Sequence, residues 1–326
     1  MLRLPPFRYL APCDVEQAVH MLAQRGEEAM LVAGGTDLYP NMKRRQFTPP
    51  VLIGLRAIQS MKIIGGSPEQ GLRIGAGVTL STLANHPLIQ RYYPALATAA
   101  DSVSTPQLRN MGTIGGNLLL DTRCNYYNQT EFWRHSIGYC KKKDGDVCPV
   151  APGSPRCWAI SSADTAPVLV SLGAQVRLVS ERDERVLPVH ELFRDDGMNP
   201  YTIDRDELLT DILLPPANGW RGAYLKLRRR GSFDFPILGV AVALRFNDDE
   251  TVADARLILG AVASHPVEAN EAAAQLLHQP LTRELIDAVA VSAAKRAKPL
   301  DNADLTINYR KQVTPIFVRR ALEQLM

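Results

Sequence analysis

Four of the five cysteines of this chain lie between positions 124 and 157, in a stretch that also carries repeated prolines and glycines. Such a composition does not support a long helix or strand, so we expect the segment at about 120–160 to be an irregular loop. Its cysteines follow the pattern C-x15-C-x7-C-x8-C. A loop of this kind needs a source of order other than regular backbone hydrogen bonds. A metal centre bound by four thiolates would provide that order. The four candidate ligands are Cys124, Cys140, Cys148 and Cys157.

The cysteine spacing leaves the nature of this centre open. Four thiolates suit a [4Fe–4S] cluster or a structural zinc ion, and the segment has no C-x-x-C pair that would separate these readings. Four unligated thiols are the third reading. His135 lies in the same segment and is expected to face solvent rather than replace a cysteine. Cys13 lies far from the others in sequence and is expected to be an ordinary thiol.

Length and charge narrow the class of protein. A chain of 326 residues with 46% hydrophobic residues is long enough for two or three domains with buried cores. The net charge of +3 gives no reason to expect binding to nucleic acid or to a membrane surface. The N-terminus lacks a secretory pattern, and no apolar run has the length of a membrane span, so we expect a cytoplasmic protein. In that reducing compartment, clustered cysteines are expected to be metal ligands or redox groups.

Two glycine-rich loops suggest a site for a phosphate-containing cofactor. Residues 34–37, Gly-Gly-Thr-Asp, follow an expected strand, and residues 112–117 read Gly-Thr-Ile-Gly-Gly-Asn. Successive glycine amides can form a concave set of N–H donors for a phosphate, and a dinucleotide has two phosphates side by side. Either loop alone is also compatible with a plain turn. Gly75 and Gly77 match the first two glycines of the nicotinamide-type fingerprint G-x-G-x-x-G. Leu80 stands where the third glycine belongs, so the fingerprint is absent.

Hydrophobic periodicity and turn residues predict an α+β fold in three parts. We expect domains at 1–55, 56–216 and 217–326, with Asp14 capping the first helix and Gly26 ending it. Expected strands lie at 30–32, 51–54, 62–64, 72–74, 168–170, 175–179, 208–214, 223–227, 239–246 and 255–262. Expected helices lie at 15–22, 79–83, 94–102, 267–278, 282–297 and 309–325.

In this order, the motifs of the chain resemble those of the FAD subunit of the molybdenum hydroxylase (xanthine oxidase/CO dehydrogenase) family. The resemblance covers nearly the whole chain. It implies a two-subdomain, PCMH-type FAD-binding region followed by a C-terminal α+β domain of three strands and helices, as in CO dehydrogenase flavoproteins. The motifs are Ala-Gly-Gly-Thr-Asp-Leu at 33–38, Gly-Ala-Gly-Val-Thr at 75–79, the run at 109–117, Ser-Ala-Asp-Thr-Ala-Pro at 162–167, Tyr-Leu-Lys-Leu-Arg-Arg-Arg at 224–230, Tyr-Arg-Lys at 309–311 and Val-Arg-Arg-Ala-Leu at 318–322.

The same resemblance implies an FAD site between the two N-terminal subdomains and no catalytic residue in this chain. Asp164 would contact the ribose or adenine end, while Leu209 and Lys226 would approach the flavin ring. A lysine there would stabilise reduced, anionic flavin. The pyrophosphate would be wrapped by Leu31, Val32, Ala33, Gly34, Gly35, Thr36, Asp37 and Leu38. The remaining implied cofactor contacts are Thr79, Ser104, Gly112, Thr113, Gly116 and Asn117.

The cysteine segment departs from the usual family pattern, in which a short connection joins the Gly-Gly-Asn turn to the Ser-x-x-Asp motif. An insert at this place is similar to that of the 4-hydroxybenzoyl-CoA reductase branch of the family. This resemblance implies a [4Fe–4S] cluster on the four cysteines and electrons from reduced ferredoxin. The electrons would pass through the cluster and FAD to [2Fe–2S] and molybdenum centres in partner subunits. There, 4-hydroxybenzoyl-CoA would be reduced to benzoyl-CoA during anaerobic aromatic degradation.

The implied partners are a molybdopterin-containing large subunit and a [2Fe–2S] small subunit, assembled as a dimer of heterotrimers. Two alternatives stay open. The chain could be the FAD subunit of another molybdenum hydroxylase, acting on an aromatic or purine substrate, with a structural zinc site. It could also be a non-catalytic assembly subunit whose cysteine loop is a zinc-stabilised docking surface.

Overall fold

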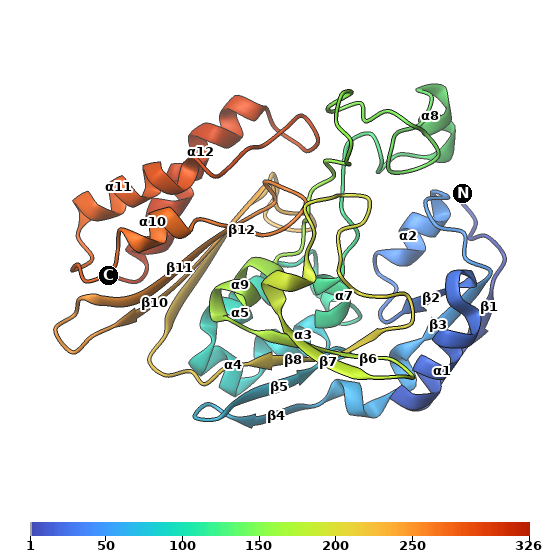
Figure 1. Cartoon of the computed structure of the whole chain (residues 1–326), viewed down its shortest axis with the longest axis horizontal. Coiled ribbons are helices and arrows are strands. Elements are labelled where there is room, and N and C mark those ends of the chain that lie inside the picture. The colour runs from blue at the N-terminus through green and yellow to red at the C-terminus, as the bar shows by residue number, and fades with distance from the viewer. Residues whose placement is uncertain (1) are drawn as a thin grey trace.

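Three β-sheets follow one another along the chain, each packed against helices, and the fold is α+β as predicted (Figure 1). The structure is a computed structural model that describes residues 2–326. The first sheet has three parallel strands, and the second and third have five and four antiparallel strands. Within residues 2–326, no helix combines the length and the apolar character needed to cross a membrane.

The N-terminal sheet has strand order β1-β3-β2. Asp14 caps α1 as predicted, because its carboxylate accepts a hydrogen bond from the backbone amide of Gln17 at 2.8 Å. Gly26 ends this helix with a φ of 51°, a conformation that glycine adopts easily. The strands expected at 30–32 and 51–54 are present, whereas β1 was not predicted because three residues are too few to show a pattern. The bounds are β1 Arg8–Leu10, α1 Val15–Arg25, β2 Ala29–Val32, α2 Leu38–Lys43 and β3 Val51–Gly54.

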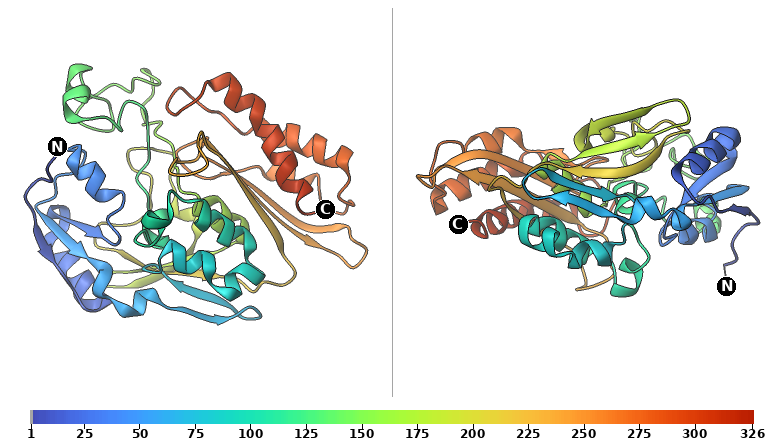
Figure 2. Two further views of the ribbon diagram at one scale, coloured as in Figure 1. Left: turned by 180° about the vertical axis from the view of Figure 1, so that it is seen from behind. Right: turned by 90° about the horizontal axis from the view of Figure 1, so that it is seen from below.

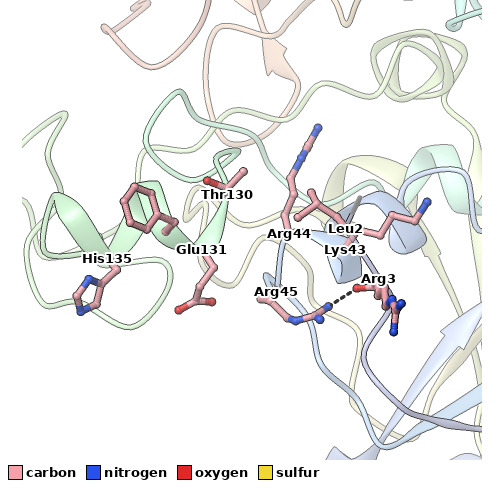
Figure 3. Close-up of a pocket in the computed structure, with 9 residues that line it drawn as sticks. Leu2, Arg3, Lys43, Arg44, Arg45, Thr130, Glu131 and His135 are labelled. Atoms are coloured by element: carbon pink, nitrogen blue, oxygen red, sulfur yellow. Dashed lines mark hydrogen bonds between the residues drawn. The ribbon is translucent and has the colours of Figure 1, made fainter.

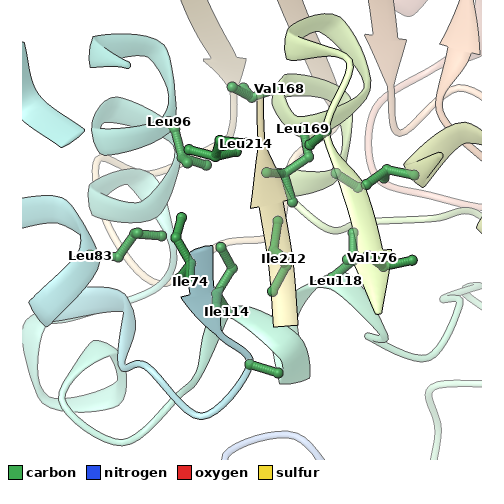
Figure 4. Close-up of a cluster of buried hydrophobic side chains, with 14 of the residues drawn as sticks. Ile74, Leu83, Leu96, Ile114, Leu118, Val168, Leu169, Val176, Ile212 and Leu214 are labelled. Atoms are coloured by element: carbon green, nitrogen blue, oxygen red, sulfur yellow. The ribbon is translucent and has the colours of Figure 1, made fainter. Parts of the chain in front are cut away.

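The second sheet has strand order β4-β5-β8-β6-β7 and carries the main core (Figure 4). Its β4–β5 hairpin confirms the predicted antiparallel pairing, although the first strand begins at Ile64 and not at residue 62, which ends a 3-10 helix. Ile74 and Ile212 from the strands are fully buried among Leu83, Leu96 and Leu169 from the helices. The bounds are β4 Ile64–Ser67, β5 Gly71–Gly75, α3 Leu80–Asn85, α4 Pro87–Tyr92, α5 Pro94–Ser102, α6 Pro106–Arg109, α7 Ile114–Leu118, α9 Thr165–Leu172, β6 Gln175–Val179, β7 Glu184–Pro188 and β8 Leu208–Leu214.

The strand expected at 168–170 is wrong, because these residues lie within helix α9. All eight residues of α9 are buried, so this helix has no polar face and its sequence shows no helical period. A short apolar run of that kind is compatible with a buried strand or a buried helix. Gly173, with a φ of 69°, ends the helix in a left-handed conformation.

The third sheet, with order β12-β11-β10-β9, is covered on both faces (Figure 2). Alternate residues of β10 belong to different cores: Val240 and Val242 pack with the C-terminal helices, and Ala241 packs with the core that contains α9. The three expected strands are present, and the helix expected at 267–278 is a two-residue strand followed by a short helix. The bounds are β9 Arg221–Leu227, β10 Leu238–Phe246, β11 Val252–Gly260, β12 Val267–Glu268, α10 Asn270–Ala274, α11 Arg283–Ala294 and α12 Ile307–Glu323.

The cysteine-bearing insert is mostly irregular, as predicted, and contains one short helix, α8 (Glu131–Ser136). It forms a protruding loop in Figure 1, drawn in green above α2. Its two ends meet in an antiparallel bridge, where the amides of Arg123 and Ile160 donate to each other's carbonyls at 2.9 and 2.8 Å. The insert also touches the C-terminal domain, because the amide of Asn125 donates to the carbonyl of Asn302 at 3.0 Å.

Candidate functional site

The two glycine-rich loops meet in the structure. One loop, residues 33–37, joins β2 to α2, and the other, residues 110–113, joins α6 to α7. A Cβ atom on Gly34 would lie 1.9 Å from the carbonyl oxygen of Met111, so a side chain at position 34 would collide with the second loop. Glycine therefore allows the two backbones to approach closely enough to face one ligand.

The backbone amides of the two loops differ in their hydrogen bonding. Within residues 2–326, the amides of residues 34–37 donate to no other protein group. By contrast, the amide of Gly112 in the second loop donates to the carbonyl of Leu108 at 2.7 Å, and that of Gly115, in α7, donates to the carbonyl of Ala76 at 2.9 Å. The first loop therefore has more unpaired amides suited to a phosphate than the second, in which the amide of Thr113 also donates to no other described protein group. The role of the second loop in binding a cofactor stays a prediction.

Asn117 and Gly116 are neighbours in α7, but Asn117 is buried against α9 and Gly116 is exposed. The side-chain oxygen of Asn117 accepts hydrogen bonds from the hydroxyl and the amide of Thr165, at 2.7 and 3.2 Å, and so ties α7 to the start of α9. Thr113 caps α7 by accepting from the amide of Gly116 at 3.1 Å. A Cβ on Gly116 would meet only that hydroxyl within 4 Å, so the space beyond Gly116 is open. Their contacts with a cofactor stay predictions.

The other residues implied for the cofactor surround these loops. Thr79 forms an isolated bridge with Thr113, which places it against the second loop. Ser104 has a φ of 48° in the turn before α6. Leu209, in β8, is 3% exposed and belongs to the main core. Leu31 and Val32 end β2, Ala33 and Thr36 lie in the first loop, and Leu38 begins α2.

The carboxylate of Asp37, inside the first loop, has its charge compensated. Its Oδ1 lies 3.1 Å from a guanidinium nitrogen of Arg123, and its Oδ2 accepts from the side-chain amide of Asn41 at 2.8 Å. Burial raises the pKa of Asp37, and the positive charge of Arg123 opposes this rise. An unpaired carboxylate would repel a phosphate, so the pair keeps this loop compatible with an anion. Arg123 directly precedes Cys124 in the chain, and it therefore joins the loop to the insert.

Asp164 and Lys226 form a buried ion pair. The Lys226 ammonium lies 2.9 Å from Asp164 Oδ2, and both side chains are less than 5% exposed. The hydroxyl of Tyr224 donates to Asp164 Oδ1 at 2.8 Å, and Lys226 also donates to the carbonyl of Ser102 at 3.0 Å. Burial raises the pKa of Asp164 and lowers that of Lys226, and each partner opposes the shift of the other.

The resemblance implied that Asp164 contacts the adenine or ribose end of the cofactor and that Lys226 approaches the flavin ring, and the structure joins the two side chains in one ion pair. Their contacts with a cofactor stay predictions. The side chain of Asp164 makes no capping hydrogen bond to α9.

The four insert cysteines gather in one place. Cys140, Cys148 and Cys157 are each no more than 6% exposed, and Cys124 is partly exposed. Burial raises the pKa of Cys124 to about 12, and negative charge on Cys157 or Cys140 adds to the rise. Burial also raises the pKa of Cys157, with Cys148 and Cys140 adding to it. Thiols that influence one another in this way belong to a single cluster. Cys13 is exposed, and His135 faces solvent, as expected.

Nearby donors oppose part of the rise that burial causes in the pKa values of Cys124 and Cys157. The backbone amides of Tyr126 and Tyr127 oppose the rise in the pKa of Cys124, and Lys142 opposes that of Cys157. The amide of Ala159 also donates to the sulfur of Cys157 at 3.4 Å. Such N–H to sulfur bonds are typical around metal-bound thiolates and tune iron–sulfur centres.

The structure gives no independent support for a metal centre on the four cysteines. Within residues 2–326, no three His, Cys, Asp or Glu side chains are close enough to hold one metal ion. The [4Fe–4S] cluster and the zinc site both stay predictions.

Three residues that matter here were not found from the sequence. Tyr224 lies two positions before Lys226 on β9, and alternate strand residues face the same side, so that spacing was an available signal. Arg123 and Arg134 lie in the irregular insert, where no period or motif marks them. Arg134 is fully buried, and its Nη2 donates to the carbonyls of Arg44 and Arg45 at 3.1 Å. Only the structure shows which groups these two arginines contact.

The comparisons with known proteins agree with this geometry. Residues 5–217 match the family described as the FAD binding domain in molybdopterin dehydrogenase, and residues 222–325 match the CO dehydrogenase flavoprotein C-terminal domain. The chain is 29% identical to the carbon monoxide dehydrogenase medium chain of Hydrogenophaga pseudoflava, over 98% of this chain and 96% of that one. It is 32% identical to the aldehyde oxidoreductase FAD-binding subunit PaoB of Escherichia coli, over 78% and 81% of the two chains.

Solved structures show the same fold. The carbon monoxide dehydrogenase structure from Hydrogenophaga pseudoflava matches with a TM-score of 0.79 and 28% identity, covering 98% of this chain and 97% of that chain. The reconstituted CO dehydrogenase from Oligotropha carboxidovorans matches with a TM-score of 0.81 and 26% identity, covering 98% of each chain. The first family match alone covers more than half of the chain and contains both glycine-rich loops. This chain therefore belongs to the molybdenum hydroxylase family, as an FAD-binding medium subunit of an oxidoreductase.

Proposed function

We propose that this chain carries electrons between a [4Fe–4S] cluster on its four insert cysteines and FAD, in an enzyme of the 4-hydroxybenzoyl-CoA reductase type. The observation that carries this proposal is the thiol cluster, attached to the cofactor loop through adjacent residues. Arg123 pairs with Asp37 in that loop, and Cys124 is the next residue of the chain. A redox centre on the cysteines would lie next to the element that binds the cofactor phosphates.

The residues of this chain would bind and position the two cofactors. The free amides of residues 34–37 would hold the pyrophosphate of FAD, with the loop at 110–113 as their support. Cys124, Cys140, Cys148 and Cys157 would ligate iron as thiolates. When bound, the cluster supplies single-electron transfer, and FAD couples it to two-electron chemistry.

The resemblance of the insert supports the particular reaction. Removal of the phenolic hydroxyl of 4-hydroxybenzoyl-CoA takes two electrons and two protons and releases benzoyl-CoA and water. This reaction works against aromatic stabilisation, so it needs a strongly reducing donor such as reduced ferredoxin, which is oxidised as it delivers electrons one at a time. The chemistry on the thioester substrate would take place at molybdenum in a partner subunit, and no residue of this chain is assigned as an acid or base.

The proposed assembly contains a molybdopterin-bearing large subunit, a [2Fe–2S] small subunit and this chain, as a dimer of heterotrimers in the cytoplasm. Two relatives support a multi-subunit enzyme, because one is a medium chain and the other is an FAD-binding subunit. Electrons would leave this chain toward the small subunit.

The test is anaerobic purification of the holoenzyme with quantitation of iron, sulfide, zinc and flavin. We expect FAD together with four iron and four sulfide ions beyond those of the [2Fe–2S] subunit. Cys148→Ser should remove the additional iron and ferredoxin-driven turnover while FAD stays bound. Cys13→Ser is the matched control, because Cys13 is exposed and lies outside the cluster. Zinc in place of iron, or undiminished ferredoxin-driven turnover in Cys148→Ser, would contradict the proposal.

A second candidate is the FAD subunit of a molybdenum hydroxylase that oxidises another substrate, with a structural metal in the insert. The 32% identity to an aldehyde oxidoreductase subunit favours it. Assays of the holoenzyme with 4-hydroxybenzoyl-CoA and reduced ferredoxin, against an aldehyde and an artificial oxidant, separate the two. A non-catalytic assembly role would predict a purified chain without flavin.

A further inference from the structure

Two hollows in the surface are lined by basic side chains, and they differ in how the charge is balanced. One has a volume of about 580 Å³ and lies between the N-terminal segment, the end of α2 and α8 (Figure 3). It contains a carboxylate of its own, that of Glu131, and the side chain of Arg45 donates to the carbonyl of Arg3 at 2.8 Å. Part of its basic lining is therefore already engaged within the chain.

The second hollow, which we call the lysine hollow, lies between the end of α11 and the start of α12. Its volume is about 670 Å³. Among residues 2–326, no acidic side chain lines it. We define the lysine hollow by six of its lining residues, which are Val291, Ala294, Lys295, Ala297, Lys298 and Lys311.

The three lysines of the lysine hollow are exposed, and their charges are not compensated. Within residues 2–326, the lysines that form ion pairs are Lys142, Lys143 and Lys226, and none of these lines the hollow. Lys295 directly follows α11, where the helix dipole favours a cation. Lys311 is the fifth residue of α12, near the end where the dipole gives a cation no support. Stabilisation of a helix end therefore accounts for Lys295 but not for Lys311.

Between the lysines, the lining of the lysine hollow is apolar. Val291, Ala294 and Lys295 have the i, i+3, i+4 spacing that places them on one face of a helix. Val291 is 58% exposed, and Ala297 is buried below it in the lining. An apolar centre with a charged rim is the usual anatomy of a protein–protein interface. Among residues 2–326, no arginine lines the hollow to clamp a phosphate and no aromatic ring lines it to stack on a base. The lining therefore favours a protein segment over a nucleotide.

A buried arginine fixes one wall of the lysine hollow. Arg310, which is 1% exposed, donates to the carbonyl of Leu300 in that wall at 3.1 Å and to the carbonyl of Ala261, just after β11, at 2.6 Å. The next residue of the chain is Lys311, so the same bonds hold the backbone that carries this lysine. A surface that is ordered before a partner arrives loses less entropy on binding. The lysine hollow is therefore preorganised on the side of α12.

We propose that the lysine hollow is the docking site of an acidic, amphipathic segment of another subunit of the same enzyme. The proposal rests on the multi-subunit assembly proposed above, and it names a surface of this chain that the assembly uses. Carboxylates of the segment pair with the ammonium groups of Lys295, Lys298 and Lys311. Apolar side chains of the segment cover Val291 and Ala294. The charge complementarity selects an acidic partner, and the apolar centre excludes water from the contact.

The test measures the affinity of the purified full chain for a complex of the other two subunits, by titration calorimetry at low salt. The double variant Lys298→Glu, Lys311→Glu should raise the Kd at least about tenfold, because two attractions become repulsions. The matched control is Arg56→Glu, Lys62→Glu, which reverses two exposed charges between β3 and β4 and should stay within about twofold of wild type. Added salt should weaken the binding of the wild type and narrow the difference between the chains.

A second variant tests the apolar part of the lysine hollow. Val291→Ser keeps every charge and should raise the Kd at least about threefold, with the difference persisting at high salt. Equal affinities of the double variant and its control would overturn the docking site. If the double variant does not fold, Val291→Ser decides the question, and a Kd equal to that of wild type would overturn the docking site.

Two measurements on the chain alone separate other occupants of the lysine hollow. Sedimentation velocity detects pairing of two copies of this chain. Cosedimentation with vesicles of phosphatidylserine and phosphatidylcholine detects binding to an anionic lipid surface. Either kind of binding, present in the wild type and lost in the double variant, would assign the hollow to that occupant and overturn the proposal.

The affinity of the wild type keeps this result separate from the assembly on which it rests. A wild-type chain that does not bind the other subunits would refute the proposed assembly, and the docking site with it. A wild-type chain that binds them, with the same Kd in the double variant and in Val291→Ser, would refute the docking site alone. Neither result depends on the metal content of the insert or on the substrate of the enzyme.

Discussion

Replacing Lys226 with methionine would leave the carboxylate of Asp164 buried without its cation. The two side chains are 4% and 3% exposed, and their charged atoms are 2.9 Å apart. Removal of one partner of such a pair costs about 3–5 kcal/mol of the free energy of unfolding. The hydroxyl of Tyr224 still donates to Asp164 in the variant, so we expect the lower end, about 3 kcal/mol.

The sign of the pH dependence follows from the pKa of Asp164. Burial raises this pKa in the wild type, and Lys226 opposes the rise, so loss of Lys226 raises it further. The unfolded carboxyl has a pKa of about 3.9. A group with a raised folded pKa contributes stability below its unfolded pKa and loses it as the pH rises through its folded pKa. The variant should therefore be closer to wild type at about pH 5 than at about pH 8.

Urea denaturation of the purified chain, followed by tryptophan fluorescence at both pH values, measures this effect. With a slope of about 3 kcal/mol/M, the midpoint should fall by about 1 M at the higher pH. The control Lys295→Met removes an exposed lysine and should change stability by less than about 0.5 kcal/mol. Two results would refute the reasoning. One is an unchanged midpoint in Lys226→Met. The other is a loss of stability in the double variant Asp164→Asn, Lys226→Met that equals the sum of the two single losses, because a neutral side chain at position 164 should no longer need a cation.

Further expectations follow from other contacts. Gly34→Ala should weaken FAD binding at least about tenfold, or ~1.4 kcal/mol, because its Cβ would collide with the second loop. Gly65→Ala is the control, because a Cβ there meets no atom within 4 Å, and it should bind FAD normally. Flavin release measures both variants. Arg134→Met should make the insert at least about tenfold more sensitive to limited proteolysis, because the turn after α2 loses two hydrogen bonds from α8. Tyr224→Phe should lower the free energy of unfolding by about 1–3 kcal/mol, since a buried carboxylate loses a donor; an unchanged urea midpoint would contradict this.

The sequence predicted those features of the fold that depend on neighbouring residues. Asp14 and Gly26 mark the ends of α1 through local backbone chemistry, and most strands show a clear period. The helix α9 was misread because every residue in it is buried, which erases the pattern that separates helix from strand. The close approach of Gly34 to Met111 was anticipated only as two loops facing one ligand.

The parts of the site that the sequence did not predict depend on long-range contacts. Arg123 meets Asp37 across 86 positions of the chain, and Arg134 meets the carbonyl of Arg44 across 90. Lys226 reaches Asp164 across 62. Nothing in the local sequence identifies such partners, and only the packing of the three sheets brings them together.

The bridge between Arg123 and Ile160 makes the whole cysteine segment a detachable module. Residues paired in an antiparallel bridge have Cα atoms about 4.5–5.5 Å apart, a gap that a two-residue turn can close. A segment of this kind can be gained or lost at a single point of the chain. An ancestral flavoprotein could thus have acquired the four clustered cysteines by one insertion.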